Sequence, residues 1–384
     1  MLRILSLNYE FPPIGGGGGN AHRHILQQFT HFSDLDITLL TSTTHPEPYS
    51  EEYSGHVRIL FLPLDKESLH YWRRREVLRY LWTHHRFLKK HLREHTYDLC
   101  HVFFGFPCGL LAYQFRKHFP YIVSIRGSDV PGYNQRFALD YILLAPALRR
   151  IYHHSARVVA NSTGLKKLFE QSYHELRARV IPNGIDTDLF HPQPKNPDRP
   201  VQLVTMARLI PRKGLDLLIN ACAELQNRQR DFRCHIIGEG PEEEPLKELA
   251  RKRNLLDRVL FHGRLEREQV KNLLPQCDIF VLPSYAEGMS NAALEAMACG
   301  LPLVLSDTGG TQELIQSNGV IFQPGNQYAL NQKLLDLVQH PRKIELLGEQ
   351  SRRHAQNFTW RRVAEQYHAL YLEVMQEKSA HGRI

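Results

Sequence analysis

Short apolar, β-branched runs alternate with helical stretches along nearly the whole of this 384-residue chain. Continuous apolar strands separated by helices predict parallel sheets that are covered on both faces. We therefore expect an α/β protein. In the first half, strands are predicted at 3–9, 36–41, 57–62, 99–104, 121–125, 157–160 and 179–181. In the second half, they are predicted at 201–207, 233–237, 259–262, 278–282, 301–305 and 320–322.

A proline-rich segment divides this alternation into two similar parts. Residues 191–200 contain four prolines, which neither a helix nor a central strand accommodates. We expect a linker there, between doubly wound domains at 1–194 and 195–359, with a last helix at about 360–384 packing back on the first. Ligands of such domains bind beyond the carboxyl ends of the strands, so two facing domains place a site in the cleft between them.

Composition limits the cellular setting. The six cysteines form no C-x-x-C pair and several lie inside apolar runs, so we interpret them as reduced core thiols, which favours the cytoplasm. No apolar run approaches the roughly 18 residues of a membrane span. Met1 to Leu7 is too short for a signal peptide.

The net charge of +8 is concentrated in residues 71–95, which carry eight basic and two acidic side chains. An apolar stripe and several aromatic residues accompany these charges. Two compatible interpretations stay open: an ordinary helix of the first domain, or a basic amphipathic helix that lies on an anionic membrane. We expect no nucleic-acid partner, because no recognised nucleic-acid module accompanies the segment.

Five consecutive glycines follow the first predicted strand, and we expect a helix to begin at Asn20 as its N-cap. Glycines let the backbone approach a ligand closely, so this turn is either a phosphate cradle or a plain surface loop. The glycines are Gly15, Gly16, Gly17, Gly18 and Gly19.

Two carboxylates, Glu287 and Glu295, lie eight positions apart after the predicted strand at 278–282. Gly288 and Ser290 mark a turn, and a helix is expected to open there, at Ala292. A helix start offers free N–H groups and a positive dipole end, which suits a phosphate. On spacing alone, an ordinary surface glutamate on a helix is the competing interpretation.

Arg208 and Lys213 follow the first strand of the second domain, where a strand passes into a helix. Two cations there could neutralise a diphosphate, although a solvated basic turn explains them as well. Glycine-containing turns of similar type lie at 237–241 and 306–311. The chain has no D-x-D sequence and no carboxylate cluster typical of a divalent metal, so we expect no metal.

In combination, these residues resemble the retaining GT-B glycosyltransferases of family 4. The resemblance covers essentially the whole chain and is most specific from about 181 to 315. It is carried by Ile181 to Asp186, Arg208, Lys213, Gly238 to Pro241, His262-Gly263, Glu287, Glu295 and Pro302 to Gly310.

The resemblance implies a role for each matching residue. Glu295 would bind the ribose hydroxyls of the donor, and Glu287 would contact the donor sugar. Arg208 and Lys213 would hold the diphosphate, which makes them catalytic together with Glu287. The phosphates would also meet the backbone of Gly15, Gly16, Gly17 and Gly18 and of Gly288, Met289, Ser290 and Asn291.

One position departs from the family pattern. Many relatives carry a His-Gly-x-Asp motif after the fifth strand, whereas this chain has Arg126 at the His position, followed by Asp129. Arginine cannot act as a general base but can hold a phosphate or an acceptor oxygen. Arg126 and Asp129 are therefore candidates for acceptor or phosphate contacts. We interpret His101 as structural.

The resemblance thus implies a retaining, metal-independent transferase with no cofactor. It would move a hexose or N-acetylhexosamine from a nucleoside diphosphate sugar to a glycan or lipid-linked acceptor, in cell-surface polysaccharide or glycolipid synthesis. The expected location is cytoplasmic, peripheral at the inner face of the membrane. The competing hypothesis is a non-catalytic nucleotide-sugar-binding module.

Overall fold

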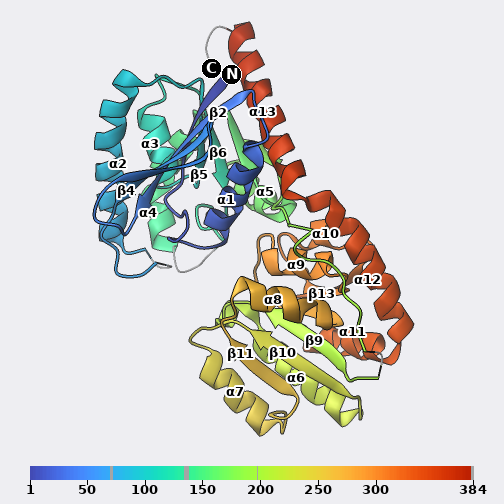
Figure 1. Cartoon of the computed structure of the whole chain (residues 1–384). Helices are drawn as coiled ribbons and strands as arrows, with labels where there is room; N and C mark the ends of the chain where they lie inside the picture. The colour runs from blue at the N-terminus through green and yellow to red at the C-terminus, as the bar shows by residue number, and fades with distance from the viewer. Residues whose placement is uncertain (70–71, 134–137, 197, 382–384) are drawn as a thin grey trace. The chain divides into compact units, whose positions relative to one another are not determined.

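The computed structural model describes residues 1–69, 72–133, 138–196 and 198–381 (Figure 1). The chain divides into two compact units. Unit 1 comprises Met1–Asn183 and Trp360–Ile384, and unit 2 comprises Gly184–Thr359. Tyr71 of the basic segment and residues 382–384 of the predicted last helix lie outside the described residues.

Unit 1 is built on an eight-stranded sheet in the order β3-β4-β2-β1-β5-β6-β7-β8. Every pairing is parallel except that of β3 with β4. The unpredicted strand is β3, a polar and largely exposed segment at the sheet edge, where no apolar pattern marks a strand. The strands are Leu2–Leu7 (β1), Leu35–Thr43 (β2), Tyr49–Ser54 (β3), Val57–Pro63 (β4), Leu99–Phe103 (β5), Tyr121–Ile125 (β6), Arg157–Ala160 (β7) and Ala178–Val180 (β8).

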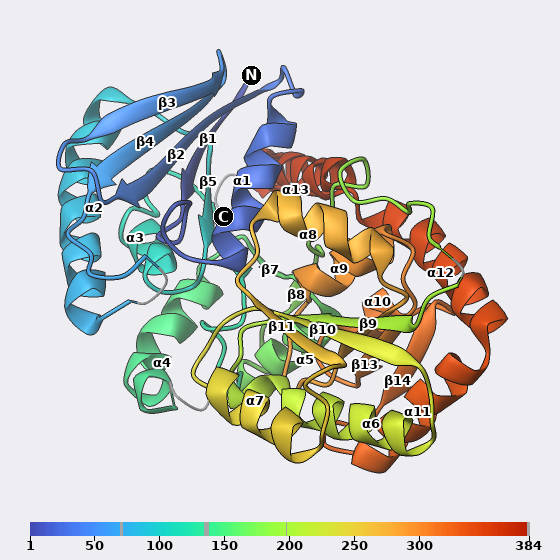
Figure 2. The ribbon, with the colours of Figure 1, turned by 60° about the horizontal axis from the view of Figure 1, so that its bottom comes forward.

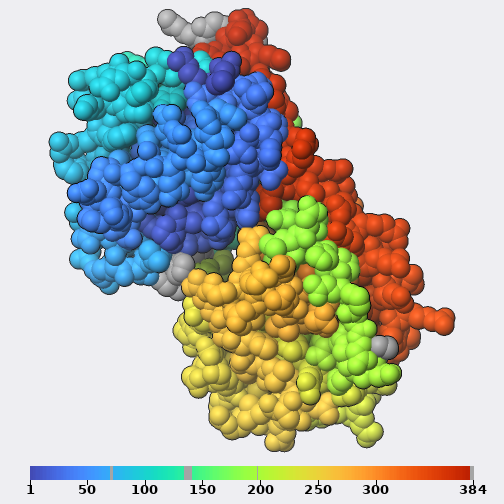
Figure 3. Space-filling model, in the orientation of Figure 1, coloured from blue at the N-terminus to red at the C-terminus, as the bar shows by residue number. Residues whose placement is uncertain are grey.

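Helices cover both faces of this sheet (Figure 2). On one face, α1 (Gly17–Phe29) packs against the last helix, α13 (Trp360–His381), whose red side chains lie along the blue surface of unit 1 in Figure 3. The buried residues of α1 recur at helical spacing, so this helix turns one apolar side to the sheet. The other face carries α2 (Arg74–Glu94), α3 (Cys108–Gln114), α4 (Ala138–His153) and α5 (Thr163–Ser172).

Unit 2 contains a six-stranded, wholly parallel sheet in the order β11-β10-β9-β12-β13-β14. Leu203 and Val204 on β9 are both buried, but they belong to different apolar clusters because successive side chains point to opposite faces. The strands are Val201–Met206 (β9), Phe232–Ile237 (β10), Val259–Gly263 (β11), Ile279–Leu282 (β12), Leu303–Ser306 (β13) and Gly319–Phe322 (β14).

Each cluster is closed by its own helices. One face is covered by α6 (Leu215–Asn227), α7 (Glu243–Lys252) and α11 (Gln327–Gln339). The opposite face is covered by α8 (Arg267–Leu273), α9 (Asn291–Ala298) and α12 (Pro341–Ala355). The remaining short helices are α10 (Thr311–Leu314) and the 3₁₀ turns Pro211–Lys213, Leu274–Gln276 and Gln356–Phe358. The predicted α/β class with parallel sheets is confirmed.

The proline-rich segment is not a free linker, because its neighbours anchor it to unit 2. Phe190 is buried in the unit 2 core. Arg199 contacts both carboxylate oxygens of Asp278, at 2.9 and 2.8 Å, and Lys195 Nζ lies 3.3 Å from the same side chain. The division therefore falls between Asn183 and Gly184 rather than at 194.

All six cysteines are free and buried, as predicted for core thiols. None of the helices in the described ranges is both long enough and apolar enough to cross a membrane.

Candidate functional site

Three predicted site residues lie beyond the carboxyl ends of neighbouring strands in unit 2. Arg208 follows β9, and Lys213 closes the 3₁₀ turn Pro211–Lys213 on the same connection. Glu287 follows β12, which pairs in parallel with β9, so both connections leave the same sheet edge.

Lys213 and Glu287 are joined directly by an ion pair between Nζ and Oε2. Their side chains are only 12% and 15% exposed, so water screens the pair little. Arg208 is exposed, and no carboxylate of the described residues lies within 4.0 Å of it. Of the three predicted catalytic residues, Lys213 and Glu287 are thus in contact. Arg208 lies on the same connection as Lys213 and forms no ion pair with the described residues.

The helix expected near Ala292 is α9, which begins one residue earlier, at Asn291. Its N-cap is Ser290, whose Oγ accepts a hydrogen bond from the N–H of Ala293 at 3.2 Å. This cap sets the direction of the helix start relative to Glu287. Met289 is buried in the unit 2 core, so its side chain anchors the loop between Glu287 and the helix.

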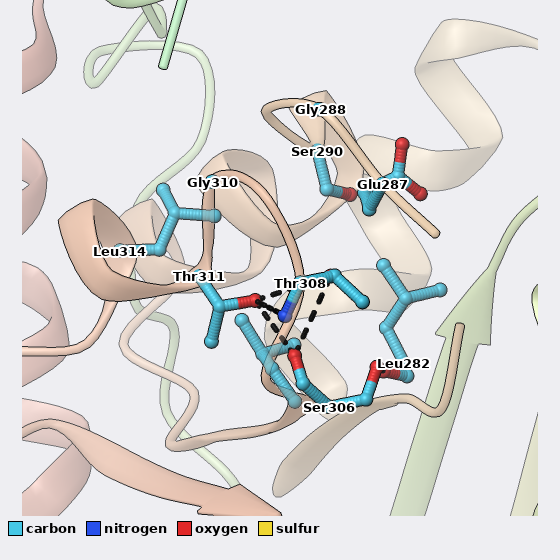
Figure 4. Close-up of a pocket in the computed structure, with 10 residues that line it drawn as sticks. Leu282, Glu287, Gly288, Ser290, Ser306, Thr308, Gly310, Thr311 and Leu314 are labelled. Atoms are coloured by element: carbon cyan, nitrogen blue, oxygen red, sulfur yellow. Dashed lines mark hydrogen bonds between the residues drawn. The ribbon is translucent and has the colours of Figure 1, made fainter. Parts of the chain in front are cut away.

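The loop at 306–311 packs against the loop at 287–290, backbone to backbone. A Cβ added at Gly310 would lie 2.3 Å from the carbonyl oxygen of Gly288, so only glycine fits there. Thr311 Oγ1 donates to the carbonyl of Ser306 at 2.7 Å and holds the turn closed. Figure 4 shows the small pocket between the two loops, lined by Leu282, Glu287, Gly288, Ser290, Leu305, Ser306, Thr308, Gly310, Thr311 and Leu314.

Glu295 is not among the residues that line this pocket. Burial raises the pKa of its carboxyl to about 7, and the charge of Arg267 at the start of α8 offsets this only in part. Glu295 therefore takes up a proton close to neutral pH. A hydroxyl donor that binds it would stabilise the ionised form.

In unit 1, the glycine run does not form a loop throughout. Helix α1 begins at Gly17, with Gly16 as N-cap, so the predicted start at Asn20 is wrong. The cause is the close approach of the preceding segment: a Cβ at Gly19 would lie 1.7 Å from the carbonyl oxygen of Glu10. Because glycines have no side chain, the helix can begin at Gly17 although the segment at Glu10 lies against it.

Asp129 is buried and holds a turn after β6. Its carboxylate accepts the backbone N–H groups of Gly105 at 2.8 Å and of Arg126 and Gly127 at 3.0 Å each. Burial raises the pKa of Asp129, while these hydrogen bonds lower it. Because its oxygens are already engaged and covered, we assign Asp129 to positioning this turn and not to an acceptor or phosphate contact.

His101 is structural, as interpreted from the sequence. Nδ1 lies 2.7 Å from the hydroxyl of Tyr371, and Nε2 lies 2.8 Å from Ser124 Oγ. Burial, assisted by the charge of Arg126, lowers the pKa of His101 to about 3. The ring therefore stays neutral at physiological pH.

Arg126 has two partners that the sequence did not suggest. Its Nη1 donates to Asn183 Oδ1 at 2.8 Å, and its Nη2 donates to the hydroxyl of Tyr367 at 3.3 Å. Asn183 belongs to the Ile181 to Asp186 motif, which marked it as notable. No sequence signal connected Tyr367, on α13, to this site.

Two family models match the chain and together run from residue 16 to 354. Residues 186–354 match "Glycosyl transferases group 1", and residues 16–189 match "Glycosyltransferase Family 4". The first range corresponds to unit 2, and the second lies mainly in the N-terminal part of unit 1.

Individual relatives agree with both models. An uncharacterized glycosyltransferase of Methanocaldococcus jannaschii is 23% identical over 97% of this chain and 99% of its own length. A GDP-mannose-dependent α-(1-6)-phosphatidylinositol monomannoside mannosyltransferase of Mycolicibacterium smegmatis is 31% identical over 236 residues, 56% of this chain and 62% of that enzyme. The structure of sucrose-phosphate synthase from Thermosynechococcus elongatus superposes with a TM-score of 0.79 at 22% identity, covering 98% of this chain and all of that one.

Proposed function

Since this chain belongs to the group 1 glycosyltransferases of the GT-B fold, we propose that it moves a hexose or N-acetylhexosamine from a nucleoside diphosphate sugar to a glycan or lipid-linked acceptor. The mannosyltransferase relative uses a GDP sugar and a phosphatidylinositol-linked acceptor, according to its name. That pairing supports the proposed donor and acceptor classes and a role in polysaccharide or glycolipid synthesis.

The observation that carries this proposal is the meeting of Lys213 and Glu287 at one sheet edge. A cation there suits a diphosphate, and a carboxylate beside it suits sugar hydroxyls. We propose that Lys213 and Arg208 stabilise the charge that develops on the leaving diphosphate. Glu287 would then exchange Lys213 for hydroxyls of the donor sugar.

The rest of the donor is assigned to neighbouring groups. Glu295 would hold the ribose hydroxyls, and its pKa of about 7 would fall once they donate to it. The backbone from Gly288 to Asn291 and that of Gly15 to Gly18 would contact the phosphates. We further propose retention of the anomeric configuration by front-face departure and attack, in which the leaving phosphate helps to deprotonate the acceptor.

Donor hydrolysis or transfer in Lys213→Ala and Glu287→Ala tests the site. Each should lose about a hundredfold or more of the rate, because Lys213 would stabilise charge on the leaving diphosphate and Glu287 would position the donor sugar. Lys271→Ala and Glu268→Ala are matched controls, because this Lys–Glu pair on α8 has Nζ and Oε1 3.0 Å apart but is more accessible to water, with side chains 30% and 70% exposed. Full activity in folded Lys213→Ala or Glu287→Ala would contradict the site assignment. A wild-type protein that binds a sugar nucleotide but neither hydrolyses nor transfers it would instead favour a non-catalytic sugar-nucleotide-binding module.

Metal independence is tested separately. We expect the rate to be unchanged by EDTA, because cationic side chains and helix N–H groups would meet the diphosphate charge. A loss of activity that Mg²⁺ restores would overturn this part of the proposal and leave the transferase assignment intact.

We also propose that α2 attaches the enzyme to the inner, anionic face of a membrane. Tyr80, His84, Leu88 and Leu92 face the core, whereas Leu78 and Trp82 are 65% and 61% exposed. The same helix carries seven exposed basic residues, of which Arg86 stacks on Trp82, and this composition suits anionic lipid. They are Arg74, Arg75, Arg79, Arg86, Lys89, Lys90 and Arg93.

Flotation with phosphatidylserine vesicles at low salt tests the attachment. We expect binding that is lost when Arg74, Arg75 and Arg79 become Glu. A matched control changes Arg251, Lys252 and Arg253, which are exposed at the end of α7 in unit 2. Absence of binding, or equal loss in both triple variants, would contradict a role for α2.

A further inference from the structure

Tyr285 lies two positions before Glu287, and its ring packs against two glycines from distant parts of unit 2. A Cβ built at Gly214 would be 3.4 Å from Cε2 of this ring, and one built at Gly325 would be 3.2 Å from Cε1. Both glycines have positive φ, +61° and +76°, a conformation that favours residues without a side chain. Tyr285 is nevertheless 47% exposed, so burial of apolar surface alone does not account for an aromatic ring there.

Each of the two glycines belongs to a different connection between a strand and a helix. Gly214 follows Lys213 directly and is the N-cap of α6, whereas Gly325 lies between β14 and α11. Gln327 Nε2 donates to the carbonyl of Leu217 at 3.0 Å, which ties the start of α11 to the first turn of α6. The aromatic ring therefore packs against two connections that are also joined to each other.

The backbone at Tyr285 also holds the connection that carries Lys213. The N–H of Tyr285 donates to the carbonyl of Arg212 at 2.8 Å. A Cβ at Gly214 would lie 2.4 Å from the carbonyl oxygen of Pro283, so the two backbones are in direct contact there as well. Lys213 thus lies between two residues that are both held by the segment after β12.

Glu287 is anchored from a different side. A Cβ at Gly309 would lie 2.4 Å from the carbonyl oxygen of Glu287, and one at Gly310 would lie 2.3 Å from that of Gly288. These contacts do not involve the tyrosine ring. Removing the ring should therefore leave Glu287 in place and chiefly loosen the turn that carries Lys213.

We propose that Tyr285 is a positioning residue of the transferase site, whose ring fixes the turn of Lys213 relative to Glu287. The inference rests on the proposed function, in which Lys213 stabilises charge on the leaving diphosphate. Such stabilisation depends on geometry, because a misplacement of about 1 Å can cost about a hundredfold in rate. The contacts with both glycines are made by ring carbons, so phenylalanine should serve as well as tyrosine.

Steady-state hydrolysis tests the role, with whichever of UDP-glucose, UDP-N-acetylglucosamine and GDP-mannose the wild type hydrolyses fastest. Tyr285→Ala should lower kcat about tenfold or more, with KM changed less than about twofold, because Lys213 acts on charge that develops in the transition state. Tyr285→Phe should keep the wild-type rate. Tyr328→Ala is the matched control, since it removes the same side chain from a 74% exposed position in the first turn of α11.

A double variant shows whether Tyr285 acts through Lys213. In Lys213→Ala protein, the further change Tyr285→Ala should cause no additional loss of rate, because no lysine is left to position. The same fold loss in both backgrounds would overturn the proposal. So would a Tyr285→Phe protein as impaired as Tyr285→Ala.

A wild-type rate in folded Tyr285→Ala would also overturn the positioning role. If Tyr285→Ala does not fold, Tyr285→Leu takes its place, because it keeps apolar bulk without the flat ring. Failure of this inference is distinguishable from failure of the proposed function. An impaired Lys213→Ala with a fully active Tyr285→Ala removes only the positioning role, whereas a fully active Lys213→Ala contradicts the site itself.

Discussion

Lys213 and Glu287, 74 positions apart in the chain, form an ion pair at the shared carboxyl edge of β9 and β12. Both side chains are assigned to the donor in the proposed function, so binding would have to separate them. Within the pair, each charge is compensated by the other. It also orients both groups toward the same place on the sheet edge.

The energetic coupling of this pair can be measured by a double-mutant cycle. Lys213→Met should lower the free energy of unfolding by about 1–3 kcal/mol, because Glu287 keeps a largely covered, uncompensated charge. Lys213→Met/Glu287→Gln should recover part of that loss, with a coupling of about 1 kcal/mol or more. Urea unfolding of the four proteins measures both values. Additive effects would show that the ion pair contributes nothing to stability.

Glu295 should make stability depend on pH between about 4.5 and 7. Its folded pKa is raised to about 7 from an ordinary 4.5, so the native state binds more protons than the unfolded state in this window. Its contribution is therefore complete below pH 4.5 and is lost as pH rises through 7, by up to about 3 kcal/mol. Glu295→Gln should remove this slope from urea titrations, whereas exposed Glu248→Gln should retain it. Parallel pH profiles for wild type and Glu295→Gln would contradict the shift.

Gly310→Ala should disturb the donor loop without touching any charged group. The new Cβ would lie 2.3 Å from the carbonyl oxygen of Gly288 and 2.8 Å from Cα of Met289, so one loop must move. We expect a loss of about 1–3 kcal/mol in the free energy of unfolding and weaker nucleotide binding. Gly55→Ala is the control, because nothing lies within 4 Å of its Cβ position. Unchanged nucleotide affinity in Gly310→Ala would show that the contact between the loops is dispensable.

Asp129→Asn should destabilise unit 1. An amide offers only one oxygen to the three N–H groups that the carboxylate accepts. Its own NH₂ group would face the N–H groups that the second carboxylate oxygen had accepted. We expect the free energy of unfolding to fall by about 2–4 kcal/mol, and exposed Asp188→Asn to have little effect. Calorimetric or urea unfolding checks this. Stability equal to that of the wild type would restore Asp129 as a candidate for ligand contact.

Much of unit 2 could be predicted from local pattern. Each of its six strands was expected within two residues of its ends, because buried parallel strands are continuous apolar runs. The neighbourhood of Glu287 and Lys213 follows as well, since residues after parallel strands meet at one edge. Their direct pairing does not follow, because it depends on side-chain directions that spacing alone leaves open.

Unit 1 shows where local pattern fails. The strand β3 carries no apolar alternation, since it lies at an edge and has little to bury. Helix α1 begins at Gly17 rather than Asn20 because the segment at Glu10 leaves room only for glycine. The edge position of β3 and the closeness of Glu10 to α1 both depend on other segments of the chain. Neither can be predicted from the local sequence of β3 or α1.

The amino-acid sequence by itself determined the alternation of strands and helices, the residues at the strand ends and the family they resemble, because these depend on local periodicity and on side-chain chemistry. The tertiary structure alone decided that the chain divides after Asn183, that Asp129 serves a turn, and that Arg126 meets Tyr367 from 241 positions away. Such contacts arise when whole elements pack together. Their partners are set by which faces the sheet and helices bury, which no short stretch of sequence encodes.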